Sequence, residues 1–154
     1  AGGALYDLNI YNLHFVMGVL GIPKEVIYRP NLGFNGIDIS GTALLDYDDY
    51  TVVCSAAKDS ESISGIVFQG EKGYMELVGA PNACALVKVH KKGEEEILIN
   101  KEKYNHRMVN EFVAFTEIFK QQDLAICYKT LEHSLNVMKV LEQARISGKV
   151  EFNI

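Results

Sequence analysis

The run Gly2-Gly3-Ala4-Leu5-Tyr6-Asp7-Leu8-Asn9-Ile10-Tyr11 is the part of the sequence that decides the fold and the candidate site. Its paired glycines let the backbone approach another surface closely. Helical spacing of apolar residues then predicts a helix over residues 5–20, and Gly21 suits the residue just past its end. On such a helix Asp7 and Tyr11, which are four residues apart, share one face.

His14 follows on nearly the same stripe, so a carboxylate, a phenol and an imidazole lie along one otherwise apolar helix. A phenol donates a proton at neutral pH, and it acts as a base only where a nearby cation stabilises the phenolate. These three side chains are therefore candidates for proton handling. The residues leave a structural alternative open, with Tyr11 at the rim of a core, Asp7 at the positive end of a helix and His14 as a structural histidine.

The middle of the chain has strand character, in short runs separated by turn residues. Strands are predicted at residues 26–28, 37–47, 50–57, 63–69, 73–78, 84–90 and 96–100. Turns such as Asp48-Asp49 and Lys92-Gly93 join neighbouring runs as hairpins, which predicts a largely antiparallel sheet. Helical spacing returns over residues 105–121 and 130–147, where Asn105 and Thr130 are the predicted N-caps.

The predicted fold class is α+β, with an N-terminal helix, an open antiparallel meander and two C-terminal helices that cover one sheet face. Runs such as Thr51-Val52-Val53-Cys54 place apolar side chains on both faces of the sheet. A sheet that is apolar on both faces must be covered twice. We therefore expect the second face to bind another copy of the chain, giving a homodimer or a higher oligomer.

Composition limits the remaining possibilities. A chain of 154 residues with 48% apolar residues suits one domain over residues 1–154. The net charge of −5 and the scattered basic residues argue against binding to nucleic acid or to an anionic membrane. No run is long enough to span a bilayer, and nothing resembles a signal peptide. The three cysteines form no metal-type pair, and we expect a reducing cytoplasm.

The order of these segments resembles the C-terminal domain of the Gfo/Idh/MocA oxidoreductases. In that family a glycine-rich start leads into a helix with Asp-x-x-x-His or Asp-x-x-x-Tyr, and Asp7 and Tyr11 match the tyrosine variant of glucose–fructose oxidoreductase and dimeric dihydrodiol dehydrogenase. Residues 41–47, 68–75 and 141–149 resemble the family's central strand, its Gly-x-x-Gly hairpin and its closing helix. The sequence departs from the family at Asn9, where glycine is usual.

The resemblance implies a parent enzyme that uses NAD or NADP and acts on a sugar, a polyol or a vicinal diol. The cofactor and a catalytic lysine would belong to an upstream Rossmann domain that is absent from this chain, since no G-x-G-x-x-G motif lies between a strand and a helix here. The fragment alone would then be inactive and would bind no cofactor or metal. Tyr11 would shuttle a proton, and Asp7 would hold the lysine or bind a substrate hydroxyl.

Three further residues are candidates for contact with the substrate. His14 follows Tyr11, His106 lies before the second predicted helix, and Asp38 is a polar residue within a strand. For each the sequence leaves a structural alternative. His14 could be a structural histidine with hydrogen-bond partners inside the protein, His106 could belong to the polar start of a helix, and Asp38 could lie on an exposed strand face. His133 is expected at the surface. The alternative for the whole chain is a non-catalytic α+β module that self-associates.

Overall fold

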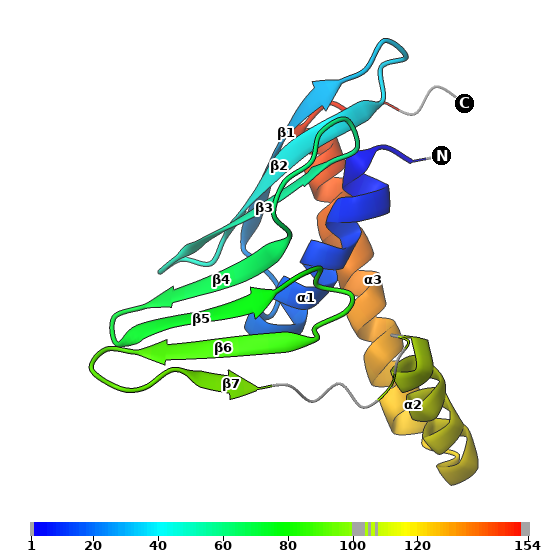
Figure 1. Cartoon of the computed structure of the whole chain (residues 1–154). Helices are drawn as coiled ribbons and strands as arrows, with labels where there is room; N and C mark the ends of the chain where they lie inside the picture. Colours follow the sequence, from blue (N-terminus) through cyan, green and yellow to red (C-terminus); the bar gives the residue numbers. More distant parts are fainter. Residues whose placement is uncertain (1, 100–103, 105, 107, 152–154) are drawn as a thin grey trace. The chain divides into compact units, whose positions relative to one another are not determined.

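The computed structural model describes residues 2–99, 104, 106 and 108–151, and the chain divides into two compact units. Unit 1 comprises residues 1–61 and 127–154, and unit 2 comprises residues 62–126. Each unit contains one antiparallel sheet (Figure 1). The α+β class and the antiparallel hairpins are confirmed, but the strands of the described residues form two meanders, of three and four strands, in place of one continuous sheet.

The first helical segment of unit 1 has the predicted bounds but begins with an unusual turn. A π-helical turn, η1 (Leu5–Asn9), continues directly into α1 (Ile10–Leu20). Gly21 ends the helix with a φ of 83°, a backbone conformation that favours glycine. Turns of the π type are rare and are often found at functional sites. Asp7 lies within this turn, and Tyr11 lies just after it.

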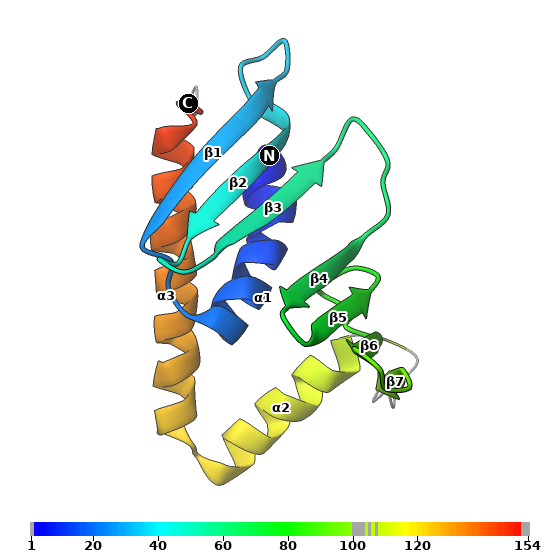
Figure 2. The same cartoon turned by 90° about the vertical axis from the view of Figure 1, so that its left-hand side faces the viewer.

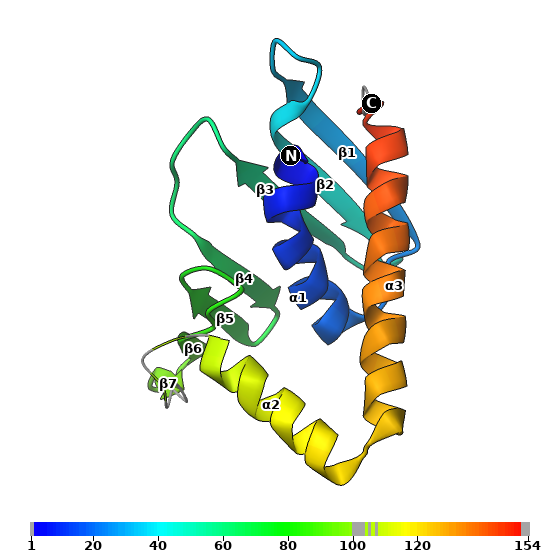
Figure 3. The same ribbon diagram turned by 90° about the vertical axis from the view of Figure 1, so that its right-hand side faces the viewer.

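Sheet A of unit 1 consists of β1 (Glu25–Leu32), β2 (Asp38–Asp46) and β3 (Thr51–Ala57), in that order. Both strand pairs are antiparallel. Figures 2 and 3 show α1 and the long last helix α3 (Leu124–Ser147) side by side on one face of this sheet. Helices therefore cover one face of sheet A, but the two are α1 and α3, whereas the sequence predicted the two C-terminal helices.

Strand β1 continues past the predicted residue 28 to Leu32, and it includes Pro30. A proline cannot donate a backbone hydrogen bond, so its presence argues against a central strand. In sheet A, however, β1 is an edge strand that pairs only with β2 among the described strands. The missing donor at Pro30 is tolerated at such an edge, which explains why the strand continues to Leu32.

The core of unit 1 forms where the two helices meet the inner face of sheet A. Its fully buried side chains include Leu13 of α1, Tyr28 and Leu45 of the sheet, and Val137 and Leu141 of α3. Burial of one such aliphatic side chain contributes about 1.5–3 kcal/mol. This shared core fixes α1 and α3 against the same sheet face, and so it fixes the orientation of the polar stripe on α1.

Unit 2 contains sheet B, formed in sequence order by β4 (Gly65–Gly70), β5 (Gly73–Val78), β6 (Leu86–Lys91) and β7 (Ile97–Ile99). It also contains α2 (Met108–Gln121), none of whose described residues is buried. Leu77 is the one fully buried side chain among the described residues of this unit. Unit 2 therefore leaves much apolar surface uncovered within the described chain.

The second and third helices differ from the prediction at their starts. Asn105 lies outside the described residues, so its predicted capping role is not seen here. Thr130 was predicted to cap the last helix, and this is wrong, because α3 already begins at Leu124. Asp123 has the capping interaction instead, since its Oδ1 accepts a hydrogen bond from the Ile126 amide at 3.0 Å. Across the helices of the described ranges, none is both long enough and apolar enough for a membrane span.

Two glycine-to-alanine substitutions should have opposite effects on stability. A Cβ at Gly3 would lie 1.6 Å from Asp38 Oδ1, whereas a Cβ at Gly18 on α1 meets nothing within 4 Å. We expect Gly3→Ala to lower the free energy of unfolding by about 1–3 kcal/mol or more, as in overpacked cores. Gly18→Ala should raise it by about 0.5–1 kcal/mol, because alanine has the better helix propensity.

Urea unfolding of both variants, followed by circular dichroism, measures this difference. Equal effects of the two substitutions would contradict the close contact between Gly3 and Asp38.

Candidate functional site

Asp38 holds the start of the first helical segment from the adjacent sheet. Its Oδ2 accepts a hydrogen bond from the Leu5 amide at 2.7 Å and another from the Tyr28 hydroxyl at 2.8 Å. A carboxylate at a helix N-terminus satisfies a free amide and favours the positive end of the helix dipole. Asp38 is only 1% exposed, so the alternative of an exposed strand face is wrong. The structure places Asp38 in the interior, where it binds the N-terminal end of η1 to sheet A on the side opposite Asp7 and Tyr11.

Tyr28 of β1 donates to the same Asp38 oxygen that binds the Leu5 amide. It is fully buried, and burial together with the hydrogen bond to Asp38 raises the pKa of its hydroxyl far above the ordinary value. A Cβ at Gly41 would lie 2.1 Å from the Tyr28 hydroxyl oxygen, and one at Gly148 would lie 2.8 Å from its ring. Small residues on β2 and after α3 thus leave the space that the phenol occupies.

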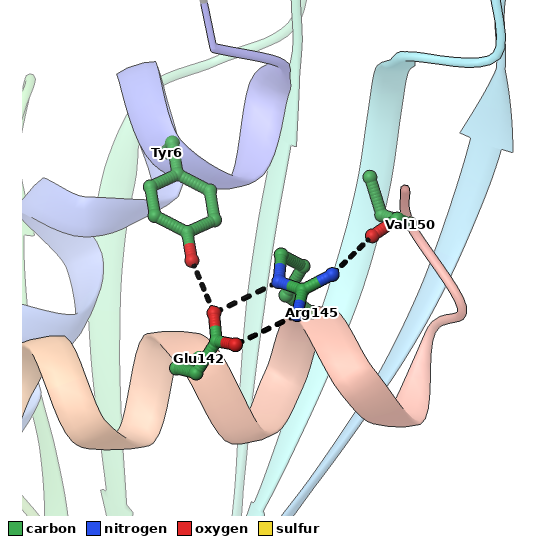
Figure 4. A network of polar contacts seen from close by, with 4 residues as sticks. All are labelled: Tyr6, Glu142, Arg145 and Val150. Carbon is green, nitrogen blue, oxygen red and sulfur yellow. Dashed lines mark hydrogen bonds and ion pairs between the residues drawn. The ribbon is translucent and has the colours of Figure 1, made fainter. Parts of the chain in front are cut away.

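A second polar network ties η1 to α3 (Figure 4). The Tyr6 hydroxyl donates to Glu142 Oε2 at 2.8 Å, and Arg145 binds both oxygens of the same carboxylate, at 2.8 and 2.7 Å. Arg145 also donates to the carbonyl of Val150 at 2.8 Å. Arg145 is the main cause that lowers the pKa of Glu142 to about 2, and burial and Glu142 raise the pKa of Tyr6 to about 12. The turn that carries Asp7 is therefore held on two sides, by Asp38 and by Glu142.

Asp7 is exposed and forms an ion pair with Lys58, which follows the end of β3. Lys58 Nζ lies 2.6 Å from Asp7 Oδ2, and it also donates to the carbonyl of Gly2 at 3.1 Å. The Asp7 side chain is 60% exposed and that of Lys58 is 33% exposed, so the pair contributes at most about 1 kcal/mol to stability. Nothing in the sequence indicated Lys58, because the pairing depends on how sheet A lies against η1.

Tyr11 is 47% exposed, on the first turn of α1. Neither Asp7 nor Tyr11 is enclosed among aliphatic atoms, and both are accessible from solvent in the described structure. Because they are four positions apart in the sequence, they lie on the same side of the helical segment. A phenol and a carboxylate on one exposed face can donate and accept hydrogen bonds to a hydroxylated ligand. Their predicted catalytic roles stay predictions.

His14 is half-buried, and it contacts a second histidine from α3. Its Nδ1 lies 3.3 Å from Nε2 of His133, and the ring centroids are 5.2 Å apart. Burial, followed by the charge of His133, lowers the pKa of His14 below its ordinary value. His133 was expected at the surface, but it is only partly exposed and is paired. The predicted contact of His14 with a substrate remains a prediction, and among the described residues only its Nδ1 has a hydrogen-bond partner.

His106 belongs to unit 2, where its side chain caps the start of α2. Its Nδ1 accepts a hydrogen bond from the Met108 amide at 3.2 Å, and its carbonyl accepts one from Val109 at 3.0 Å. This arrangement agrees with the alternative of a polar start of a helix. His106 lies in unit 2, whereas Asp7 and Tyr11 lie in unit 1.

Two other features of the described chain contribute little to a site. A shallow, open hollow lies on the β4–β5 hairpin of unit 2, and it contains none of the predicted site residues; its lining is Val67, Gln69, Gly70, Glu71, Gly73, Tyr74 and Lys92. Among the described residues, no group of three or more histidine, cysteine, aspartate or glutamate side chains is placed to hold a metal ion.

Comparison with known proteins identifies what this arrangement resembles. The chain is 28% identical over 148 residues to scyllo-inositol 2-dehydrogenase (NADP(+)) IolU of Bacillus subtilis, and the match covers 94% of the chain and 44% of that protein. A match of 31% identity over 75 residues to the uncharacterized oxidoreductase YgjR of Escherichia coli covers 49% of the chain and 23% of that protein. No protein-family profile matches the chain.

Solved structures share the fold. Aldose-aldose oxidoreductase from Caulobacter crescentus, complexed with glycerol, superposes with a TM-score of 0.75 at 16% identity, over 96% of this chain and 46% of that one. The inositol dehydrogenase homolog from Azotobacter vinelandii, complexed with NADH and myo-inositol, gives 0.67 at 11% identity, over 95% and 48%. The resemblance to the C-terminal domain of the Gfo/Idh/MocA oxidoreductases is confirmed. The chain spans about half the length of the relatives that it matches over most of its length.

The departure from the Gfo/Idh/MocA pattern at Asn9 has a structural reason. Asn9 is fully buried, and its amide donates to the carbonyl of Cys54 on β3 at 3.3 Å. Its side-chain oxygen accepts a hydrogen bond from Asn12 at 2.7 Å, and Asn12 also donates to the carbonyl of Ser55. The asparagine pair therefore binds the helical segment to sheet A, so Asn9 connects the candidate site to its support.

The stability of unit 1 should depend on pH through Glu142. Because Arg145 lowers the pKa of Glu142 in the folded protein from 4.5 to about 2, this carboxylate stabilises the fold above pH ~4.5, and the stabilisation is lost as the pH falls toward 2. We expect Glu142→Gln to be less stable than the wild-type chain at pH 7, with a difference that shrinks between pH ~4.5 and ~2.

Urea unfolding at a series of pH values measures the effect. Glu132→Gln on the same helix is the control, since its carboxylate joins no described residue in a hydrogen bond or ion pair. A difference between Glu142→Gln and the wild type that stays constant across this pH range would contradict the network in Figure 4.

Proposed function

We propose that this chain is the substrate-binding and oligomerisation domain of an NAD(P)-dependent oxidoreductase that acts on a sugar, a polyol or a vicinal diol. The observation that carries the proposal is the exposed pair of Asp7 and Tyr11 on one face of a helical segment held rigidly from behind. The relatives named above support the substrate class, because their names specify an inositol and an aldose. In this proposal a nucleotide-binding domain precedes the chain in the complete enzyme.

The described residues do not themselves fit a dinucleotide. Such a site needs a parallel strand–helix–strand unit with a glycine-rich turn that opens a helix. Both described sheets are antiparallel throughout, and their strands are joined as meanders. We therefore assign the cofactor to the preceding domain, and this chain to the side of the substrate.

Removal of a hydride from a carbinol carbon leaves a proton on its oxygen, and a positioned side chain must accept that proton. We assign this role to the Tyr11 oxygen, which is accessible on α1 and accepts the proton as a phenolate that a cation of the preceding domain stabilises. Asp7 Oδ2 is already bound by Lys58 of the same chain. Its other oxygen forms no hydrogen bond or ion pair with another described residue, so we assign it to a hydroxyl group of the substrate.

Replacing Tyr11 by phenylalanine tests the proposal in the complete enzyme. Because only the proton-carrying oxygen is removed, we expect turnover to fall by about 10²–10⁴-fold, the range typical of general acid–base groups. The affinity for NAD(P)H should stay unchanged, since the cofactor lies in another domain. Steady-state kinetics on inositols and aldoses, together with fluorescence titration of NAD(P)H, give both quantities.

Tyr50→Phe is the matched control, because Tyr50 has the same exposed fraction of 47% and lies in the turn between β2 and β3. Unchanged turnover of Tyr11→Phe would remove Tyr11 from the chemistry. Micromolar binding of NAD(P)H to this chain alone would contradict the assignment of the cofactor to another domain.

Sheet B supports the oligomerisation role. Apart from Lys91 at the end of β6, one of its faces is apolar, with rows such as Phe68, Met75, Val89 and Ile97 across the four strands. The opposite face carries an ion pair of Glu76 with Lys88, but also exposed apolar side chains; these are Val67, Tyr74, Val78 and Leu98. Exposed apolar surface of this kind is typical of an interface. We assign the exposed apolar surface of sheet B to contact with a second copy of the chain, because a symmetric dimer covers the same surface on both partners.

An acidic residue at Val67 should weaken self-association. Val67 is 58% exposed on β4, and Val67→Asp would place an unpaired charge in the proposed interface. We expect the dissociation constant to rise at least about tenfold. Val19→Asp on α1 is the control, with a closely similar exposed fraction of 57%. Analytical ultracentrifugation over a range of concentrations measures the constant, and a wild-type chain that is monomeric throughout would contradict the role of sheet B.

A further inference from the structure

The contact between His14 of α1 and His133 of α3 has no part in the function proposed above. The two ring nitrogens are 3.3 Å apart, within hydrogen-bond distance. Both helices are fixed by buried side chains in the same core, with Val16 and Met17 on α1 and Val137 and Val140 on α3. The rings are therefore held together by rigid elements, because neither helix can move without disturbing the core.

A hydrogen bond between two imidazoles fixes the position of one proton. One ring must donate an N–H and the other must accept with its lone pair, so the two rings cannot both be fully protonated in this contact. The Nε2–H form is the more stable tautomer of a neutral histidine side chain. That form suits this geometry, since His133 Nε2–H then donates to His14 Nδ1. His14 in turn keeps its own proton on Nε2, at the other side of its ring.

The position of His14 along α1 places its Nε2–H near a ligand bound at Asp7 and Tyr11. His14 lies three residues after Tyr11, and Tyr11 lies four residues after Asp7, so the three side chains follow one stripe. Asp7 and Tyr11 are exposed, whereas His14 is half-buried and backed by His133. Along this stripe, the imidazole of His14 is the next polar side chain after Tyr11 that a ligand can contact.

We infer that His133 is a positioning residue: it fixes the ring plane and the tautomer of His14, so that His14 Nε2–H donates a hydrogen bond to a hydroxyl oxygen of the polyol substrate. The substrate contact rests on the proposed function, but the link between the two histidines does not. The arrangement follows a general logic in which a third group orients the side chain that acts on the substrate.

The first experiment examines the histidine pair in this chain alone. Long-range ¹H–¹⁵N correlation spectra of histidine-labelled protein identify the tautomer of each ring. We expect His14 to be the Nε2–H tautomer in the wild-type chain and in His133→Gln, whose side-chain amide can still donate to Nδ1. His133→Leu removes the donor, and a substantial fraction of the Nδ1–H tautomer should appear. Removal of the His133 ring should also raise the pKa of His14, since His133 contributes to lowering it.

The second experiment measures kinetics in the complete enzyme. His133→Leu should raise the KM for the polyol about tenfold with a smaller change in kcat, and His133→Gln should restore most of the affinity. Glu132→Leu, which replaces the exposed residue just before His133 on α3, is the matched control and should leave KM and the His14 tautomer unchanged, since the Glu132 carboxylate joins no described residue in a hydrogen bond or ion pair.

The two experiments separate failure of the inference from failure of the proposed function. A wild-type His14 that is the Nδ1–H tautomer, or a tautomer unaffected by His133→Leu, would overturn the link between the histidines. An unchanged KM in His133→Leu, with turnover still lost in Tyr11→Phe, would overturn the substrate contact alone. A complete enzyme that turns over no polyol or sugar would refute the proposed function, and with it the substrate contact, whereas the spectra would still decide the role of His133.

Discussion

The hydrogen bond from the Leu5 amide to the buried carboxylate of Asp38 is the constraint on which the candidate site depends. It joins the first turn of the helical segment to β2, and the Tyr28 hydroxyl binds the same oxygen from β1. The close approach of strand and turn excludes a side chain at position 3, because a Cβ there would overlap Asp38. A glycine before the helix is thus required by contact with the strand, and the exposed face with Asp7 and Tyr11 is a consequence of where the opposite face is held.

Local patterns predicted the secondary structure well, and tertiary contacts account for what they missed. The hairpins and the bounds of the first helical segment followed from turn residues and apolar spacing. The strand around Pro30 was cut short, because its place at a sheet edge is not visible in the sequence. The division into two sheets was also missed. The earlier start of α3 was missed because no proline or glycine marks the turn before Leu124.

The candidate site shows the same limit. Asp7, Tyr11 and His14 were identified from their spacing on one helix, because a single element sets their mutual geometry. Lys58 and His133 were missed or placed at the surface, although they contact two of those three side chains. Both come from other elements more than 45 residues away in the sequence, so only the packed core brings them close. Asp38 was noticed as a polar residue in a strand, but its role as support depends on burial that the sequence alone does not give.

Asp7 and His14 are held by different kinds of contact, an exposed ion pair and a partly buried ring pair, and this difference distinguishes the roles of Asp7, Tyr11 and His14. Asp7 is compensated by a cation on an exposed surface, where an ion pair is weak and easily exchanged for a ligand. His14 is backed by a second ring within a partly buried contact, where a hydrogen bond is harder to exchange for water. Tyr11 lies between them and is 47% exposed. A ligand on this face would therefore meet one adaptable acceptor, one accessible phenol and one fixed imidazole, an arrangement suited to a molecule with adjacent hydroxyl groups, of which one reacts and its neighbours are held.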